Sequence, residues 1–259
     1  MAHMGHLSID PIDKQPTLSI MGPNPVRTRE SLVPSVIEPT PLHANIYPEM
    51  RELLLGHPSA EEIRQWLIPL GFEGWQETYE RLGRLAELTR DPIALANLLP
   101  YLLVMLGNAP TPDHVLVNLE RFFQRAHRPA TLLHTLADNL RGLEILIRLF
   151  AGSQFLTEIL LRNPEYLDTL INLRTLAQSK TVPQLNAELR EFENANGRDL
   201  TRDHLRRFQR RELLRIGGCD LLDLLNMLTV TVQLSNLADC LVQAGLDLQV
   251  HARGLAHLA

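Results

Sequence analysis

The chain has 259 residues, with 25 basic and 30 acidic side chains, which gives a formal net charge of −5. Apolar residues make up 45% of the sequence, enough to bury a substantial core. This balance excludes a uniformly basic nucleic-acid-binding protein, although a local basic face stays possible. Two cysteines, Cys219 and Cys240, are too few for a disulfide framework and indicate reduced thiols in a cytoplasmic protein.

The first 48 residues differ from the rest of the chain in composition. They hold eight of the 17 prolines, and proline removes backbone donors and prevents a helix from running through a segment. Their short apolar groups show no sustained period, and no secretion signal is present. We therefore predict a disordered Pro-rich leader over residues 1–48 and a helical domain over residues 49–259.

The most apolar stretch of the chain, residues 93–106, is too short to cross a membrane. A transmembrane helix needs about 20 mostly apolar residues, and Asn97 and Pro100 interrupt this stretch. We therefore expect a buried helix at this position and no membrane as a partner.

Helical signals recur from residue 49 to the end of the chain. Ser59 and Glu62 have the spacing of a capping box, in which each side chain satisfies a free N–H group. No alternating apolar and polar run of strand length is present, and no repeat of solenoid length. The sequence therefore predicts an all-α fold, an irregular multi-helix bundle. Prolines mark the expected first turns of several helices, at Pro92, Pro112, Pro164 and Pro183.

An arginine-rich segment, residues 197–223, carries the clearest signal in the chain. Its seven arginines include two series with four-residue spacing, although the chain as a whole is acidic. On a helix, its apolar residues share one face. The opposite face presents four candidate partner-binding residues, namely Arg206, Arg207, Arg210 and Arg211. The Gly217–Gly218 pair must either end this helix or mark the close approach of another backbone.

Two interpretations of this arginine face stay open. Such a face is often simply solvated and salt-bridged, with the arginine stems covering apolar neighbours. Alternatively, the guanidinium groups dock an acidic partner or a phosphate, since they can bind either through two hydrogen bonds. Nucleic acid is the weaker candidate, because no aromatic side chain suited to base stacking shares the arginine face.

The last helix is expected from about Thr229 to His251. Cys219 and Cys240 are expected in the core, because no histidine stands at metal-ligand spacing from either cysteine. If a neighbouring domain is missing, an apolar strip around Leu237, Leu241 and Leu248 should be exposed to solvent and favour self-association. Apolar residues recur along the helix at three- and four-residue steps, at Val230, Leu234, Leu237, Leu241, Ala244 and Leu248.

Two strings of residues carry a resemblance to a known family. The string Leu205 to Ile216, followed by Leu-Ser-Asn-Leu-Ala-Asp at residues 234–239, resembles the glutamine synthetase adenylyltransferase/adenylyl-removing family. Residues 149–165 are similar to the helical segment that precedes the first catalytic domain of that family. The resemblance covers roughly residues 140–245.

The resemblance implies a regulator of nitrogen assimilation. Members of the family transfer AMP from ATP to glutamine synthetase, and a related domain removes it by phosphorolysis. Both reactions are expected to need Mg²⁺, held by an Asp-x-Asp pair that follows a Gly-rich turn, because divalent ions neutralise phosphate charge.

This chain lacks the motif on which that chemistry depends. No Asp-x-Asp pair and no Gly-rich phosphate loop occur in the sequence. Glu191 and Glu193 have the spacing of paired carboxylates, but their side chains would diverge on a helix. We therefore predict no catalytic, cofactor-binding or metal-binding residue, with ATP and Mg²⁺ belonging to the full-length family protein. Whether the chain is an enzyme by itself stays open.

The leading hypothesis is an amino-terminal helical region that precedes the first nucleotidyltransferase domain of such a protein and is inactive alone. It would be a fragment, a truncated reading frame or a split-gene product. Its expected partners are glutamine synthetase and the nucleotidyltransferase domain that follows in the family. The alternative is a free-standing α-helical interaction module, which binds an acidic protein or nucleic acid through the arginine face.

Overall fold

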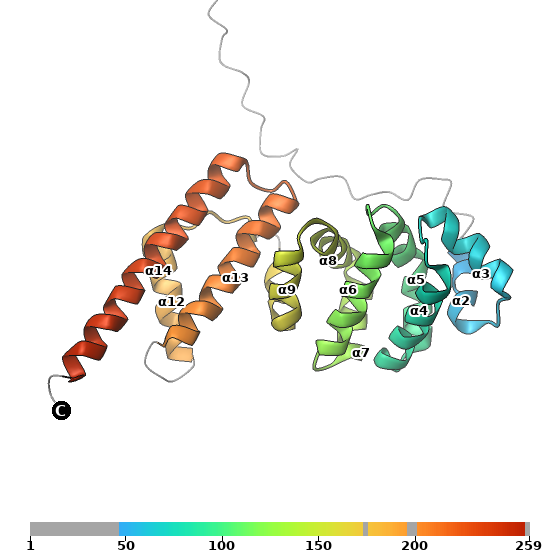
Figure 1. Ribbon diagram of the computed structural model, residues 1–259, viewed down its shortest axis with the longest axis horizontal. Helices are drawn as coiled ribbons and strands as arrows, with labels where there is room; N and C mark the ends of the chain where they lie inside the picture. The colour runs from blue at the N-terminus through green and yellow to red at the C-terminus, as the bar shows by residue number, and fades with distance from the viewer. Residues whose placement is uncertain (1–46, 173–175, 196–200, 257–259) are drawn as a thin grey trace, which may run out of the picture. The chain divides into compact units, whose positions relative to one another are not determined.

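The computed structural model describes residues 47–172, 176–195 and 201–256 (Figure 1). These residues form helices joined by turns, with no strand among them, which confirms the predicted all-α class. They all belong to one compact unit, residues 36–259. The predicted leader lies outside the described residues as far as residue 46, and the first helix begins at Tyr47.

The first part of the described chain holds seven α-helices whose starts follow the local chemistry of the sequence. The Ser59 N–H donates to the Glu62 carboxylate at 2.7 Å, which completes the predicted capping box. Asp91 caps the helix that begins at Pro92, because its side chain accepts from the Ala94 N–H at 2.9 Å. The elements are α1 (Tyr47–Met50), α2 (Glu52–Leu55), α3 (Ala60–Leu67), η2 (Ile68–Leu70), α4 (Trp75–Thr89), α5 (Pro92–Gly107), α6 (Pro112–Arg125) and α7 (Pro129–Asp138).

The second part of the described chain follows the same rules of capping. Asn139, Ser153 and Thr201 each accept a hydrogen bond from a backbone N–H of the helix that they precede. The elements are α8 (Leu140–Gly152), α9 (Gln154–Arg162), η3 (Pro164–Tyr166), α10 (Leu167–Ile171), α12 (Val182–Ala195), α13 (Arg202–Leu221) and α14 (Met227–Ala256).

The main hydrophobic core extends from α1 to α13 and includes the most apolar helix, α5. Leu99, Leu103 and Leu106 of α5 are fully buried, as predicted for this stretch. No helix in the described part of the chain has the length and apolar composition needed to cross a membrane. Phe122 and Phe150 meet edge to face in this core, with ring centroids 5.9 Å apart.

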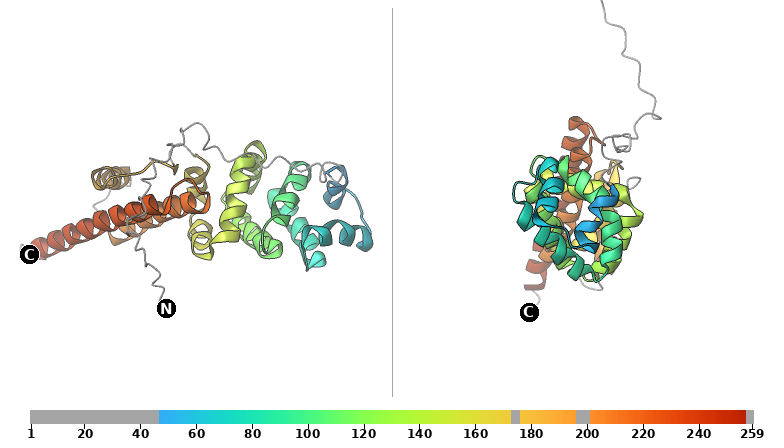
Figure 2. Two further views of the ribbon diagram at one scale, coloured as in Figure 1. Left: turned by 90° about the horizontal axis from the view of Figure 1, so that it is seen from above. Right: turned by 90° about the vertical axis from the view of Figure 1, so that its right-hand side faces the viewer.

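A second, smaller core lies among α12, α13 and α14, which run side by side in Figures 1 and 2. Helix α13 contributes to both cores: Leu214 and Cys219 belong to the main core, and Phe208 and Ile216 to the smaller one. It therefore packs on α8, α9 and α10 as well as on α12 and α14. This double contact makes α13 the element that joins the two cores.

The glycine pair on α13 does not end the helix, which continues to Leu221. A Cβ atom at Gly217 would lie 2.7 Å from the Leu156 Cδ1 atom, and one at Gly218 would lie 2.9 Å from the Leu170 Cδ2 atom. Neither predicted possibility is therefore right as stated, although close neighbours are present. The neighbours are leucine side chains of α9 and α10 rather than a backbone.

Helix α14 is longer than expected, and its predicted apolar seam is wrong in part. Val230, Leu237 and Ala244 are buried as predicted, but Leu234 is 42% exposed and a polar residue, Gln233, is buried instead. Of the three leucines expected in an exposed strip, Leu237 is buried, and Leu241 and Leu248 are only partly exposed. Exposed apolar side chains of α14 lie elsewhere, at Met227, Leu228, Val232, Leu234, Val242, Leu246 and Val250.

Candidate functional site

The four candidate arginines of α13 do not share one environment. Arg206 is exposed and forms an ion pair with Asp203, one turn earlier, at 3.1 Å. Arg207 is exposed and Arg210 half-buried, and neither forms an ion pair with another described residue. Among the described residues, therefore, no acidic side chain pairs with Arg207 or Arg210.

Arg211 is held by the protein itself. Its guanidinium group lies 3.2 Å from the Glu188 carboxylate and 3.4 Å from that of Glu212. The same group lies 5.1 Å from the centroid of the Phe208 ring, in cation–π contact. Arg211 is thus part of the internal structure, and a test of the arginine face should leave it in place.

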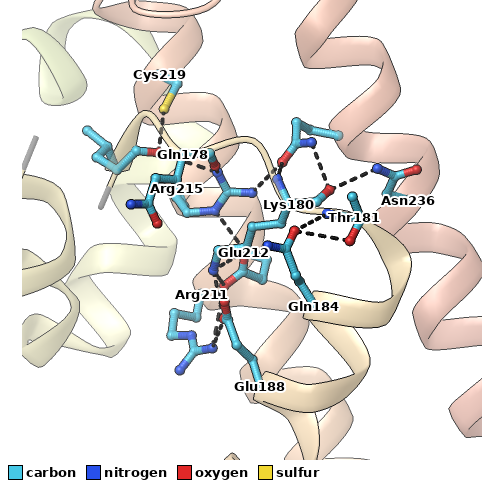
Figure 3. Close-up of polar contacts among 12 residues, drawn as sticks. Gln178, Lys180, Thr181, Gln184, Glu188, Arg211, Glu212, Arg215, Cys219 and Asn236 are labelled. Carbon is cyan, nitrogen blue, oxygen red and sulfur yellow. Dashed lines mark hydrogen bonds and ion pairs between the residues drawn. The ribbon is translucent and has the colours of Figure 1, made fainter. Parts of the chain in front are cut away.

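Arg215, which continues one of the arginine series, is only 2% exposed. Its Nε atom donates to the Glu212 carboxylate at 2.8 Å and its Nη2 atom to Gln233 Oε1 at 2.9 Å (Figure 3). Its Nη1 atom donates to the carbonyls of Gln178, at 2.9 Å, and Leu176, at 3.3 Å. Each nitrogen of this buried cation therefore has an acceptor, as burial of a charge requires.

Glu212 is the carboxylate at the centre of this arrangement and is 1% exposed. The Lys180 Nζ atom donates to both of its oxygens, at 3.0 and 3.2 Å, and to the Glu188 carboxylate at 2.7 Å. Burial raises the pKa of Glu212, but the positive charges of Lys180 and Arg215 outweigh it and lower the pKa overall. Glu212 is therefore ionised at neutral pH.

The backbone of Lys180 connects the same arrangement to α14. Its N–H donates to Gln233 Oε1 at 2.8 Å, and its carbonyl accepts from the side-chain amides of Gln233 and Asn236, both at 2.9 Å. The segment before α12 is thus fastened to α14 by hydrogen bonds. We call this set the buried network; it comprises Lys180, Glu188, Arg211, Glu212, Arg215 and Gln233 (Figure 3).

The two cysteines lie in the interior, as predicted, and both are free thiols. The Cys219 thiol donates to the Leu176 carbonyl at 3.1 Å, and burial raises its pKa to about 11. Within the described residues, no cluster of three histidine, cysteine or carboxylate side chains could hold a metal ion. Residues 191 and 193 fall within helix α12, where we expected them.

The fold and the buried network define an all-α protein in which one basic helix is fixed between two cores. Sequence comparison adds a family: residues 143–257 match the family model for glutamate-ammonia ligase adenylyltransferase. This segment contains α9, α13 and α14 and every member of the buried network. No solved structure matches the chain.

Three curated relatives illustrate the similarity, and each is a bifunctional glutamine synthetase adenylyltransferase/adenylyl-removing enzyme. The relative from Thioalkalivibrio sulfidiphilus is 30% identical over 76% of this chain and 22% of its own length. Those from Mycobacterium leprae and Pasteurella multocida are 30% and 29% identical over 82% and 72% of this chain. This chain belongs to the glutamine synthetase adenylyltransferase/adenylyl-removing family, and it spans about a fifth of the length of these relatives.

Proposed function

We propose that this chain is the amino-terminal helical part of a glutamine synthetase adenylyltransferase/adenylyl-removing protein and transfers no AMP by itself. The observation that carries the proposal is a family match over residues 143–257 in a sequence that contains no Asp-x-Asp pair. Nucleotidyl transfer needs carboxylates that hold divalent ions against the phosphates. In this proposal, ATP and Mg²⁺ are bound by the nucleotidyltransferase domain of the whole protein.

The role that we propose for the chain is that of a scaffold in the regulation of nitrogen metabolism. The buried network supports this role, because its ion pairs join α12 and α13 and the hydrogen bonds of Gln233 join both to α14. Exposed apolar residues of α14, such as Val242 and Leu246, suit a contact with the nucleotidyltransferase domain. The free thiols of the core suit the cytoplasm.

Glutamine synthetase is the partner that we propose for the arginine face. Two arginines support this, exposed Arg207 and half-buried Arg210, because neither forms an ion pair with a described residue. A guanidinium group in that state can still bind a carboxylate through two hydrogen bonds. The same observation supports the second candidate function, a free-standing interaction module for an acidic protein. Both candidates predict that the arginine face binds its partner electrostatically.

Substitution of Arg206, Arg207 and Arg210 by glutamine tests this partner. We expect the affinity of the chain for glutamine synthetase, measured by sedimentation at low salt, to fall about tenfold, because several charge-assisted hydrogen bonds are lost. Arg211 is left unchanged, since its substitution would disturb the buried network.

The matched control replaces Arg51, Arg64 and Arg128 by glutamine. These residues are exposed on other parts of the chain, so the control removes the same charge from a different place. Equal affinities of the two triple variants, or no binding of glutamine synthetase by the unmodified chain, would refute the proposed partner.

A further inference from the structure

A groove with a volume of about 390 Å³ lies between α9 and α13, which pack against each other. Helix α9 contributes Phe155, Ile159 and Arg162, and α13 contributes Arg210 and Leu213. The groove therefore joins part of the arginine face to side chains that the sequence did not connect with it. It combines an apolar floor with two cations that come from different helices.

The charges in this groove are positive on balance. Arg162 is exposed on the last turn of α9, Arg210 lies opposite on α13, and neither forms an ion pair with a described residue. Glu158 also lines the groove, but its carboxylate lies 3.1 Å from Arg121 and accepts from the Gln154 amide at the same distance. The acidic charge is thus compensated within the protein, whereas no ion pair to a described residue compensates either basic charge.

The apolar part of the groove is unusually accessible. Phe155 is 61% exposed, although phenylalanine normally buries most of its ring, while Ile159 beside it is almost fully buried. Aromatic and arginine side chains together are the residue types that contribute most to binding energy at protein interfaces. An apolar side chain placed against Phe155 would remove both surfaces from water.

We propose that this groove binds an acidic peptide segment of a partner protein, with one large apolar side chain as its anchor. The peptide carboxylates pair with Arg162 and Arg210, and the apolar side chain rests on Phe155 and Ile159. Charge complementarity selects the acidic segment, and the floor between the two cations selects the anchor. A nucleic acid fits less well, because its phosphates would meet that apolar floor and the chain carries a net charge of −5.

The test measures fluorescence anisotropy of a labelled, glutamate-rich synthetic peptide with one central leucine. We expect Arg162→Ala and Arg210→Ala each to weaken binding about tenfold, because each removes a charge-assisted contact. Arg202→Ala is the matched control: Arg202 lies on the same helix, is exposed and does not line the groove, so affinity should change less than about twofold.

A second comparison tests the anchor. Phe155→Ser should weaken binding of the leucine peptide. A second peptide, with serine in place of leucine, should bind the unmodified chain more weakly, and Phe155→Ser should not change that binding. All the substituted side chains lie at the surface, and circular dichroism melting verifies that each variant folds.

Three results would overturn the proposal. The first is that the leucine peptide shows no saturable binding. The second is that it binds the unmodified chain and an Arg162→Ala/Arg210→Ala double variant with equal affinity. The third is that an oligothymidine binds more tightly than the peptide. The assay contains neither glutamine synthetase nor nucleotide. A negative result in this assay would therefore leave the proposed scaffold role intact. Evidence against the scaffold role would likewise leave the peptide specificity of the groove intact.

Discussion

Substitution of Arg215 by methionine is expected to lower the free energy of unfolding by about 3–5 kcal/mol, because it leaves a buried carboxylate without one of its closest cations. The side chain of Glu212 would keep Lys180 but lose the hydrogen bond from Arg215 Nε. The carbonyls of Leu176 and Gln178 would lose a donor as well. Methionine has a similar volume to the arginine stem, so the loss reports the charge and its hydrogen bonds rather than a cavity.

Urea unfolding measures this loss, with Arg206→Met as the matched control. Arg206 lies on the same helix and has an acidic partner three residues away, as Arg215 does, but its ion pair is exposed. Exposed pairs contribute about 0–1 kcal/mol, so the control should unfold almost like the unmodified protein. Equal stabilities of the two variants would contradict the burial of the network.

Substitution of Gln233 by alanine should cost about 2–4 kcal/mol, because several buried groups lose their hydrogen-bond partner together. Gln233 Oε1 accepts from Arg215 Nη2 and from the Lys180 N–H, and its amide donates to the Lys180 carbonyl. The variant should also speed hydrogen exchange at the Lys180 amide, since the segment before α12 is no longer fastened to α14.

The control for this second variant is Gln243→Ala on the same helix. Gln243 is exposed and, among the described residues, donates to Asp247 alone, one turn away, at 3.0 Å. Its loss should therefore change stability by less than about 0.5 kcal/mol. Because Arg215 and Gln233 share a hydrogen bond, their double variant should lose less than the sum of the single variants. An additive double variant, or a Gln233→Ala protein as stable as the control, would show that the two residues act independently.

The parts of the fold that depend on local chemistry were predictable from the sequence. Capping by Ser59 and the proline-marked helix starts depend on neighbouring residues, and each is found where expected. Burial of α5 followed from its apolar composition. The orientation of α14 was predicted less well, because Gln233 turns inward only when Lys180 and Arg215 are present to bind it.

The buried network was missed because its members come from separate parts of the chain. Lys180 stands 32 residues before Glu212 and 53 residues before Gln233, and nothing in either interval predicts their contact. A partial signal was present, since Glu212 and Arg215 lie at helical spacing from Phe208 and therefore on the apolar face of α13. A charged pair on an apolar face indicates a buried ion pair. The four-residue spacing of the arginines on α13 instead draws attention to the solvent-facing side of this helix.

We propose that this chain, although it belongs to the adenylyltransferase family, transfers no AMP itself. Incubation of the chain with glutamine synthetase, Mg²⁺ and ATP labelled at its α-phosphate tests this proposal, with a full-length family member as the positive control. We predict no label on glutamine synthetase above the level seen without the chain. Sustained, chain-dependent labelling would contradict the proposal.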